Sequence, residues 1–345
     1  MEKIFTEDDL IYIQNRGNSI EKIQQQLDFF IQGIPKINLV RSAKVGDGIW
    51  QFSEEETNDF VIYFDKHKTN YSIEKFVPAS GAATRMFKFL NEFLNDFDVE
   101  NDTINSYINK RNAKDISIFI FGLKNFPFYR ELKEKTIQLY PNYYSLSSDK
   151  KYHALIKTLL SKEGLDFANK PKGILPFHVR DEKIITPIEE NIFESDFFKK
   201  ENQKTKIHFT ITEEFQPDFE KITNQFSECE ISFSYQNQST DTLAVNEDNT
   251  PFRIEDDKLF FRPGGHGALI ENLNALNSDI IFIKNIDNVS QNHKKVIEIN
   301  KKLLGGVLLL MQYKIFNYLK LLSSGNVTEA QISEIKDFAE NKTAF

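Results

Sequence analysis

The pattern over residues 73–97 constrains the fold more than any other feature of this sequence. An apolar run over residues 73–77 predicts a buried β-strand, and the small residues over 78–85 predict a sharp turn. Apolar side chains then recur at helical spacing over residues 86–97. A strand that leads through a tight turn into a helix is a βα unit, and such units build sheets of mostly parallel strands. We therefore expect an α/β core.

Strand and helix patterns alternate again between residues 165 and 290. Helices are expected over 187–198 and 219–226, and strands over 207–211, 231–235, 259–261 and 279–286. The last of these strands is apolar enough to predict a place at the centre of a parallel sheet. The expected core is an α/β fold with a mixed, mostly parallel sheet.

The predicted core divides the rest of the chain. Residues 1–72 form an N-terminal helical segment, 73–97 and 165–290 the α/β core, 98–164 an inserted helical subdomain, and 291–345 a C-terminal helical segment. Ser19 is expected to cap one N-terminal helix, and Ser53 with Glu56 forms the capping-box pattern of another. The insertion contains an expected helix over 149–160, and the C-terminal segment a long amphipathic helix with a bend at Gly305 and Gly306, followed by a polar tail.

Composition excludes several classes of protein. The 51 acidic and 43 basic residues give a net charge of −8, without the basic excess of a general nucleic-acid binder. The single cysteine, Cys229, excludes an intrachain disulfide framework and suits a reducing compartment, so a cytoplasmic location is expected. The N-terminus is too acidic for a signal peptide, and the longest apolar run is too short to cross a bilayer, so no membrane partner is expected. The histidines show no spacing typical of a zinc site.

Two segments near residue 270 carry the chemistry of a nucleotide site. Residues 262–269 (RPGGHGAL) consist largely of bare backbone, whose N–H groups can approach a base or a phosphate closely. Residues 280–287 form a predicted buried strand that ends in the carboxylate of Asp287. Ligands of open α/β sheets lie beyond the carboxyl ends of the strands, so Asp287 is the expected metal ligand for a triphosphate.

Motifs in this order resemble those of the sugar-nucleotide pyrophosphorylases. Residues 79–86 (ASGAATRM) resemble their AGGxGTRL signature, and Pro171-Lys172-Gly173 resembles their PKG element. Residues 209–213, 233–238, 263–269 and 285–288 resemble later elements of the UDP-sugar group, so the resemblance covers residues 73–290 in order. The whole chain is also similar to an uncharacterised bacterial family known only as a domain of unknown function.

The resemblance implies a Rossmann-like nucleotidyltransferase fold of the GT-A type, with the α/β core as the nucleotide-binding part. A sugar 1-phosphate would attack the α-phosphate of a nucleoside triphosphate, most simply UTP, and pyrophosphate would leave with the help of Mg²⁺. Arg85 would hold the pyrophosphate, Lys172 would neutralise the α-phosphate, and Asp287 would bind Mg²⁺. The implied nucleotide-binding residues are Ser80, Gly81, Ala82, Ala83, Thr84, Gln236, Gly264, Gly265 and His266, with Gln238 as the alternative to Gln236.

The sequence departs from the family pattern in ways that keep other hypotheses open. Ser80 and Ala83 replace two glycines of the signature, and their side chains take up room where phosphates would approach the backbone. The related enzymes also continue beyond the last matched element, so a shortened or reduced protein is one interpretation. A catalytically reduced protein that binds nucleotides or nucleotide-sugars is the alternative function. A scaffold whose Phe-rich insertion binds a protein partner is a third.

The individual site residues also have simpler interpretations. Arg85 at the start of a helix is often a solvated surface charge, and Asp287 could cap the next helix or turn. A P-loop kinase is not expected because no GxxxxGK[ST] motif occurs, and a serine hydrolase is not expected because no GxSxG motif occurs.

Overall fold

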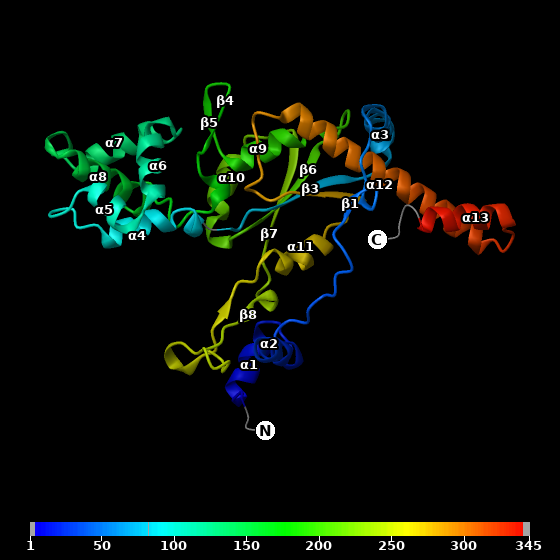
Figure 1. Cartoon of the computed structure of the whole chain (residues 1–345), viewed down its shortest axis with the longest axis horizontal. Coiled ribbons are helices and arrows are strands. Elements are labelled where there is room, and N and C mark those ends of the chain that lie inside the picture. Colours follow the sequence, from blue (N-terminus) through cyan, green and yellow to red (C-terminus); the bar gives the residue numbers. More distant parts are fainter. Residues whose placement is uncertain (1–3, 82, 341–345) are drawn as a thin grey trace.

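The computed structural model describes residues 4–81 and 83–340. Its centre is a parallel sheet of four strands: β3 (Ile73–Pro78), β6 (Thr205–Ile211), β7 (Cys229–Tyr235) and β10 (Ile280–Ile283) (Figure 1). The spatial order is β10-β3-β6-β7, so the chain moves outward from β3 to β7 and then returns to the other side of β3. An α/β protein with a parallel sheet is confirmed.

All four strands run in the same direction, so their carboxyl ends meet at one edge. Pro78 at the end of β3 pairs with Thr210 of β6, which pairs in turn with Ser234 of β7. β10 continues the pairing on the other side, where Ile283 lies opposite Phe76. The loops that follow the strands therefore share this edge.

Strand β10 lies at the edge of the sheet, which corrects the expected central position. Its neighbour on one side is β3, and the side chain of Ile283 is 60% exposed. The apolar run that suggested a central strand is buried on one side only, because Ile280 and Phe282 pack under helices. A short run of apolar residues does not by itself distinguish an edge strand from a central one.

Helices cover one face of this sheet. α9 (Pro187–Glu194) and α10 (Gln216–Thr223) pack through Ile188 and Phe219 against alternate residues of β3 and β6, including Val77 and Phe209. α9 begins as expected with a proline in its first turn, and Thr186 forms its capping box. On the opposite face, the short helix α11 (Ile270–Asn274) is tied to β7 by a hydrogen bond that the Asn272 amide donates to the Tyr235 carbonyl.

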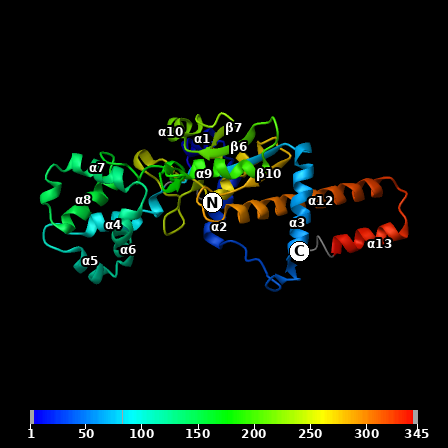
Figure 2. The ribbon, with the colours of Figure 1, turned by 90° about the horizontal axis from the view of Figure 1, so that it is seen from above.

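Two further helices cross at one end of the sheet. α3 (Glu54–His67) begins at the predicted capping box, and α12 (Lys294–Ser323) packs across it (Figure 2). The prediction of a bend at Gly305 and Gly306 is wrong, because α12 continues unbroken through both glycines. A β-carbon on Gly306 would lie 2.1 Å from the Phe60 carbonyl oxygen, and one on Gly305 would lie 2.6 Å from the Phe64 ring. The glycines therefore serve a close helix–helix contact.

The segment after β3 forms a lobe of helices beside the sheet (Figure 1). Its helices are α4 (Lys88–Asp96), α5 (Ile104–Arg111), α6 (Lys114–Gly122), α7 (Tyr129–Leu139) and α8 (Ser148–Leu160). They share a core rich in aromatic rings, in which Phe93 stacks on Phe97 at 4.8 Å and Phe128 packs edge-on against Phe167 at 5.1 Å. Helix α8 agrees with the prediction, except that it begins one residue earlier and is capped by Ser147.

The N-terminal helices form a second lobe. α1 (Glu7–Asn15) and α2 (Ile20–Gln32) bury Ile13, Ile23 and Leu27 against residues of β8 (Thr242–Leu243) and β9 (Phe261–Arg262). The predicted cap at Ser19 is confirmed, and α2 ends at Gly33. The strand expected over 259–261 is reduced to the two residues of β9.

The remaining elements are short strands and a terminal helix. They are β1 (Lys44–Val45), β2 (Gly48–Ile49), β4 (His178–Arg180), β5 (Lys183–Ile185) and α13 (Glu329–Phe338). Helix α13 lies within the expected C-terminal helical segment, and Thr328 and Gln331 form a capping box at its start. Among the described residues, no helix combines the length and apolar character that crossing a membrane would require.

Candidate functional site

The strand order reverses between β3 and β10, the position at which open parallel sheets form a crevice for their ligands. β6 and β7 lie on one side of β3, and β10 lies on the other side. The chain therefore leaves β3 and β10 in different directions. In open parallel sheets, ligands bind outside the carboxyl ends of the strands at the position where the order reverses. The loops that follow Pro78 and Ile283 therefore border the candidate site.

The loop after β3 is joined to the Pro-Lys-Gly element by backbone hydrogen bonds. The Lys172 N–H donates to the Gly81 carbonyl at 3.2 Å, and the Ala83 N–H donates to the Lys170 carbonyl at 3.4 Å. Lys172 starts a turn of 3₁₀ helix (Lys172–Ile174) against α9. The inserted lobe thus separates the two motifs in sequence and leaves them adjacent in space.

Asp287 completes this group from the opposite side of the crevice. Its Oδ2 atom lies 2.9 Å from Lys172 Nζ, and the preceding Ile286 N–H donates to the Pro78 carbonyl at 3.4 Å. Gly173 packs on two side chains, because a β-carbon there would lie 3.3 Å from Ile188 Cγ1 and 3.4 Å from Ile286 Cγ1. The side chains of Lys172 and Asp287 are 22% and 41% exposed. Water therefore reaches this ion pair, and opening it costs about 0–1 kcal/mol.

The two residues that replace glycines differ in burial. Ala83 is fully buried in the aromatic core of the inserted lobe, so its methyl group points away from the crevice. Ser80 is half-buried, and its carbonyl accepts a hydrogen bond of 3.4 Å from Thr212 Oγ1 at the end of β6. A β-carbon on Gly81 would meet no described atom within 4 Å outside its chain neighbours.

Arg85 is described in full, whereas two residues of the loop before it are not. Arg85 ends a 3₁₀ turn (Ala83–Arg85) and is exposed, and its guanidinium pairs with no carboxylate among residues 4–81 and 83–340. Ala82 and the side chain of Thr84 lie outside the described part of the chain. Arg85 is a cation beside the crevice that remains available for a ligand.

Gln236 follows β7 at the same edge but is already hydrogen-bonded. Its Nε2 donates to Asp241 Oδ1 at 3.2 Å, and Asp241 Oδ2 accepts from Arg16 Nη2 at 2.5 Å. β7 and β10 are the two outer strands of this sheet, so Gln236 and Asp287 follow strands on opposite sides of β3. Gln238, the alternative to Gln236, is exposed at the start of a 3₁₀ turn.

The glycine-rich element contacts the loop that follows Gln236. A β-carbon on Gly264 would lie 2.8 Å from the Thr240 carbonyl oxygen and 2.9 Å from Ala268 Cβ, so a glycine is required there by protein contacts. A β-carbon on Gly265 would meet no described atom within 4 Å outside its chain neighbours. His266 begins a 3₁₀ turn (His266–Leu269), and its side chain lies outside the described part.

The donor set suits a magnesium ion bound together with phosphates. No group of three or more His, Cys, Asp or Glu residues that could hold a metal occurs within the part of the chain that the structure describes. Mg²⁺ keeps several waters and is usually held by one or two carboxylates plus substrate phosphates. The exposed carboxylate of Asp287 fits that role, whereas a structural metal site built from protein ligands alone does not.

A cluster of charges lies beneath the helix-covered face and was not predicted from the sequence. Lys75 of β3 is completely buried, with Nζ 3.0 Å from Glu194 Oε1 and 2.7 Å from the Asn191 carbonyl oxygen. Lys284 and Lys301 also pair with Glu194. Burial lowers the pKa of Lys75 to about 7, while Glu194 opposes that shift. Burial alone would raise the pKa of Glu194, but the lysines around it, Lys75 first, lower it to about 2.

The sequence does not show which residues form this cluster, because its members come from β3, α9, the segment after β10, and α12. A lysine within an apolar strand pattern is the one local signal, and a buried lysine requires a partner. The same holds for Arg16 and Asp241, which meet only when the N-terminal lobe docks.

Comparison with known proteins identifies a family and no activity. A model of the family described as "Domain of unknown function (DUF4301)" matches residues 6–345. No curated protein and no solved structure matches the chain. The predicted similarity to a family of unknown function is thereby confirmed, and the resemblance to pyrophosphorylases stays a prediction.

Proposed function

The chain belongs to this family of unknown function, and we propose from its own geometry that it is a magnesium-dependent nucleotidyltransferase of the GT-A type. In this proposal a sugar 1-phosphate attacks the α-phosphate of a nucleoside triphosphate, most simply UTP, and pyrophosphate leaves. The observation that carries the proposal is the meeting of Gly81, Lys172 and Asp287 at the crevice where the strand order reverses.

The proposed chemistry uses charge and position. Phosphoryl transfer depends mostly on holding the reactants in line and on neutralising the negative charge that develops. The Lys172 ammonium would turn from Asp287 to the α-phosphate, and the Arg85 guanidinium would hold the leaving pyrophosphate. When bound to Asp287, Mg²⁺ would neutralise the phosphate oxygens. The low cost of opening the Lys172–Asp287 pair supports this exchange of partners.

The base would lie toward β7. Gln236 and Asp287 follow the two outer strands at the same edge of the sheet, so a nucleotide extended along this edge would have its metal near Asp287 and its base near Gln236. The glycine-rich element around Gly264 lies next to Gln236. Uracil would then compete with Asp241 for the Gln236 amide, or the base would be held by Gln238 instead.

A second candidate function is nucleotide or nucleotide-sugar binding without turnover. One observation favours it: the Lys172 ammonium and the Asp287 carboxylate already pair with each other, so neither group is held ready for a reacting phosphate. Such a protein would retain the nucleotide and would not release pyrophosphate.

Titration calorimetry with UTP, ATP, GTP and a UDP-sugar, with and without Mg²⁺, tests both functions. Under the proposal one nucleotide binds more tightly with Mg²⁺, and Asp287→Asn removes that dependence. Asp115→Asn, on the exposed surface of α6, is the matched control and keeps it. Pyrophosphate exchange on the bound nucleotide then separates an enzyme from a binding protein. If no nucleotide gives a heat of binding in the titration, and none raises the melting temperature of the protein in a thermal scan, both functions are wrong.

A further inference from the structure

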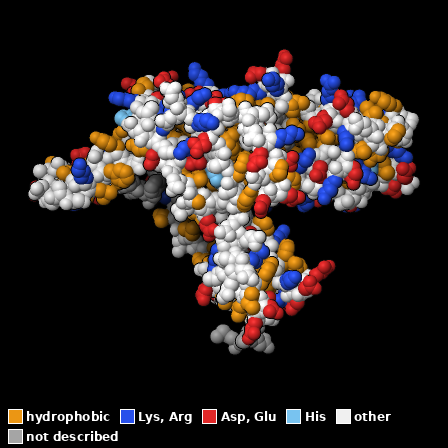
Figure 3. Space-filling model, turned by 180° about the vertical axis from the view of Figure 1, so that it is seen from behind, with side chains coloured by type: hydrophobic (Ala, Val, Ile, Leu, Met, Phe, Trp, Pro, Cys, Tyr) orange, Lys and Arg blue, Asp and Glu red, His pale blue; other side chains and the backbone are white. Residues whose placement is uncertain are grey.

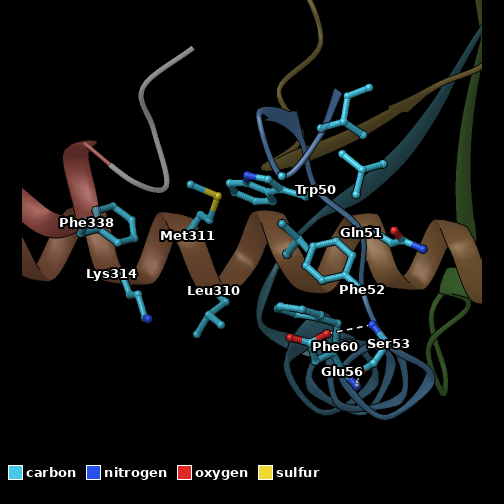
Figure 4. A pocket seen from close by; sticks show the side chains of 14 residues that line it. Trp50, Gln51, Phe52, Ser53, Glu56, Phe60, Leu310, Met311, Lys314 and Phe338 are labelled. Atoms are coloured by element: carbon cyan, nitrogen blue, oxygen red, sulfur yellow. Dashed lines mark hydrogen bonds between the residues drawn. The ribbon is translucent and has the colours of Figure 1, made fainter. Parts of the chain in front are cut away.

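Two pockets outside the candidate site differ in their chemistry. One lies between the linker that joins α2 to α3 and an arm that the second half of α12 forms with α13 (Figure 4). Its wall is mostly apolar, and within it Phe52 packs edge-on against Trp50 and against Phe60, with ring centres 6.2 and 5.1 Å apart. These contacts belong to the packing of the linker on α3.

The other pocket lies at the amino ends of β3 and β6 and is lined mainly by polar residues. Its volume is about 300 Å³, at the lower end of the range for small-molecule sites. The lining includes Lys200, Lys204 and Lys206 and no described Asp or Glu. Basic and acidic side chains are interspersed over the face of the molecule seen in Figure 3. A pocket lined by three lysines and no described carboxylate therefore differs from the general surface.

The three lysines use few of their hydrogen-bond donors. Lys200 Nζ donates to the Tyr71 carbonyl, and Lys206 Nζ lies 3.5 Å from Ser72 Oγ. Lys204 is exposed. None of the three forms an ion pair with a carboxylate in the described part of the chain, whereas Lys68 nearby pairs with Asp65. Each ammonium has three N–H donors, so most of the donors around this pocket remain for a ligand.

The cations of this region also repel one another. Burial lowers the pKa of Lys200, Asp279 opposes the shift, and the ammonium groups of Lys206 and Lys68 lower the pKa further. An anion bound between the ammonium groups would favour their charged forms and offset this repulsion.

The carboxylates around the pocket are either bonded to other groups or exposed to water. Asp279 accepts a backbone N–H at 2.6 Å, and Glu74 accepts a serine hydroxyl at 2.8 Å. Asp65 pairs with two lysines outside the pocket lining. Glu201 and Glu230 are exposed, where water and salt screen their charges. The lining of the pocket itself therefore carries a positive charge.

We propose that the pocket at the amino ends of β3 and β6 binds the phosphate group of a small soluble molecule. Lysine ammonium groups bind phosphate as compact charges. The side chains of Thr69, Asn70 and Gln203 in the same lining supply neutral hydrogen-bond donors. The net charge of −8 argues against a nucleic-acid backbone as the source of the phosphate.

This pocket is separate from the proposed nucleotide site. It lies where β3 begins, whereas Lys172 and Asp287 lie beyond the carboxyl ends of the strands, at the opposite edge of the sheet. The proposal therefore stands or falls independently of the nucleotidyltransferase function.

Titration calorimetry with inorganic phosphate, without Mg²⁺, gives the first test. Lys200→Met and Lys206→Met should each weaken binding about tenfold or more, because each removes a charged donor. Lys199→Met is the matched control, since this exposed lysine is the neighbour of Lys200 and lies outside the lining. Thermal scans without phosphate check that the variants remain folded.

Three results would overturn the proposal. The first is no heat of binding at millimolar phosphate. The second is the same weakening in Lys199→Met as in Lys200→Met, which would mean general attraction to a basic surface. The third is loss of binding in Lys172→Met with full binding in Lys200→Met, because the phosphate would then occupy the candidate nucleotide site.

Differential acetylation locates the phosphate on the unmodified sequence and needs no variant. The protein is treated briefly with acetic anhydride, with and without inorganic phosphate, and the lysines are compared by mass spectrometry. Bound phosphate should slow the acetylation of Lys200 and Lys206 severalfold and leave Lys199 unchanged. Equal slowing at all three lysines, or none, would contradict the proposal.

Discussion

Lys172 Nζ and Asp287 Oδ2 lie 2.9 Å apart although 115 positions separate the two residues. They meet because β3 and β10 are neighbours and because the Pro-Lys-Gly turn returns from the inserted lobe to the loop after β3. The pair lies beyond the carboxyl ends of these strands, where the ligand of an open parallel sheet is expected. Its exposure makes it a poor stabiliser and a good candidate for exchange with a ligand.

Replacing either member of this pair should affect ligand binding more than folding. For Lys172→Met and for Asp287→Asn we expect the free energy of unfolding to fall by no more than about 1 kcal/mol, because water already solvates both groups. Urea unfolding measures this change. Lys150→Met, which removes the exposed pair with Glu100, should give a change of the same size. If either variant lost several kcal/mol of unfolding free energy, the ion pair would be a stabilising part of the fold and not an exchangeable contact.

Arg85→Ala should lower the rate of nucleotidyl transfer at least tenfold while leaving stability unchanged. The guanidinium has no described carboxylate partner to lose, and a contact made to the leaving pyrophosphate should act on kcat more than on KM. Steady-state rates of pyrophosphate release measure the effect. Lys88→Ala is the control, since this exposed cation lies three positions further along and pairs with Glu92. Equal rates of pyrophosphate release for the two variants would show that Arg85 does not contact the reacting groups.

Gly306→Ala should destabilise the protein by about 3 kcal/mol. The added methyl group would meet the Phe60 carbonyl oxygen at 2.1 Å, so α3 and α12 would have to separate. Thermal or urea unfolding measures the loss. Gly122→Ala on the inserted lobe is the control, because its added carbon meets no atom within 4 Å and φ there is −83°. A change at Gly306 as small as the one at Gly122 would mean that the two helices do not cross closely.

Lys75→Met should flatten the pH dependence of stability between pH 7 and pH 10.5. Burial lowers the pKa of folded Lys75 to about 7 from 10.5, so in this window the unfolded chain binds more protons than the folded chain. The wild-type stability contributed by this group therefore rises as the pH increases from 7 to 10.5. Methionine removes that rise. Urea midpoints at pH 7, 8 and 9 provide the measurement, and Lys88→Met is the exposed control. Parallel curves for wild type and Lys75→Met would contradict the shift.

Local sequence signals predicted most of the helices and strands. The cap at Ser19, the capping box of Ser53 and Glu56, and the strands at residues 73–77 and 207–211 are all found. Each of these depends on side chains a few positions apart, which hydrogen-bond or pack within one element. The sequence also placed Lys172 and Asp287 in separate motifs with complementary charges.

Only the tertiary structure decided which of these motifs meet. A glycine pair has the same sequence pattern whether a helix bends there or another helix packs closely against it. The sequence therefore predicts a bend at Gly305 and Gly306, whereas the structure shows a close contact with α3. An apolar run likewise does not reveal its neighbours, so β10 was expected at the centre of the sheet and lies at its edge. The sequence by itself determined the elements and their chemistry, because these depend on residues close in the chain. The crevice, the buried lysine cluster and the exposed arm depend on contacts between distant segments, whose formation balances packing against the entropy of closing long loops.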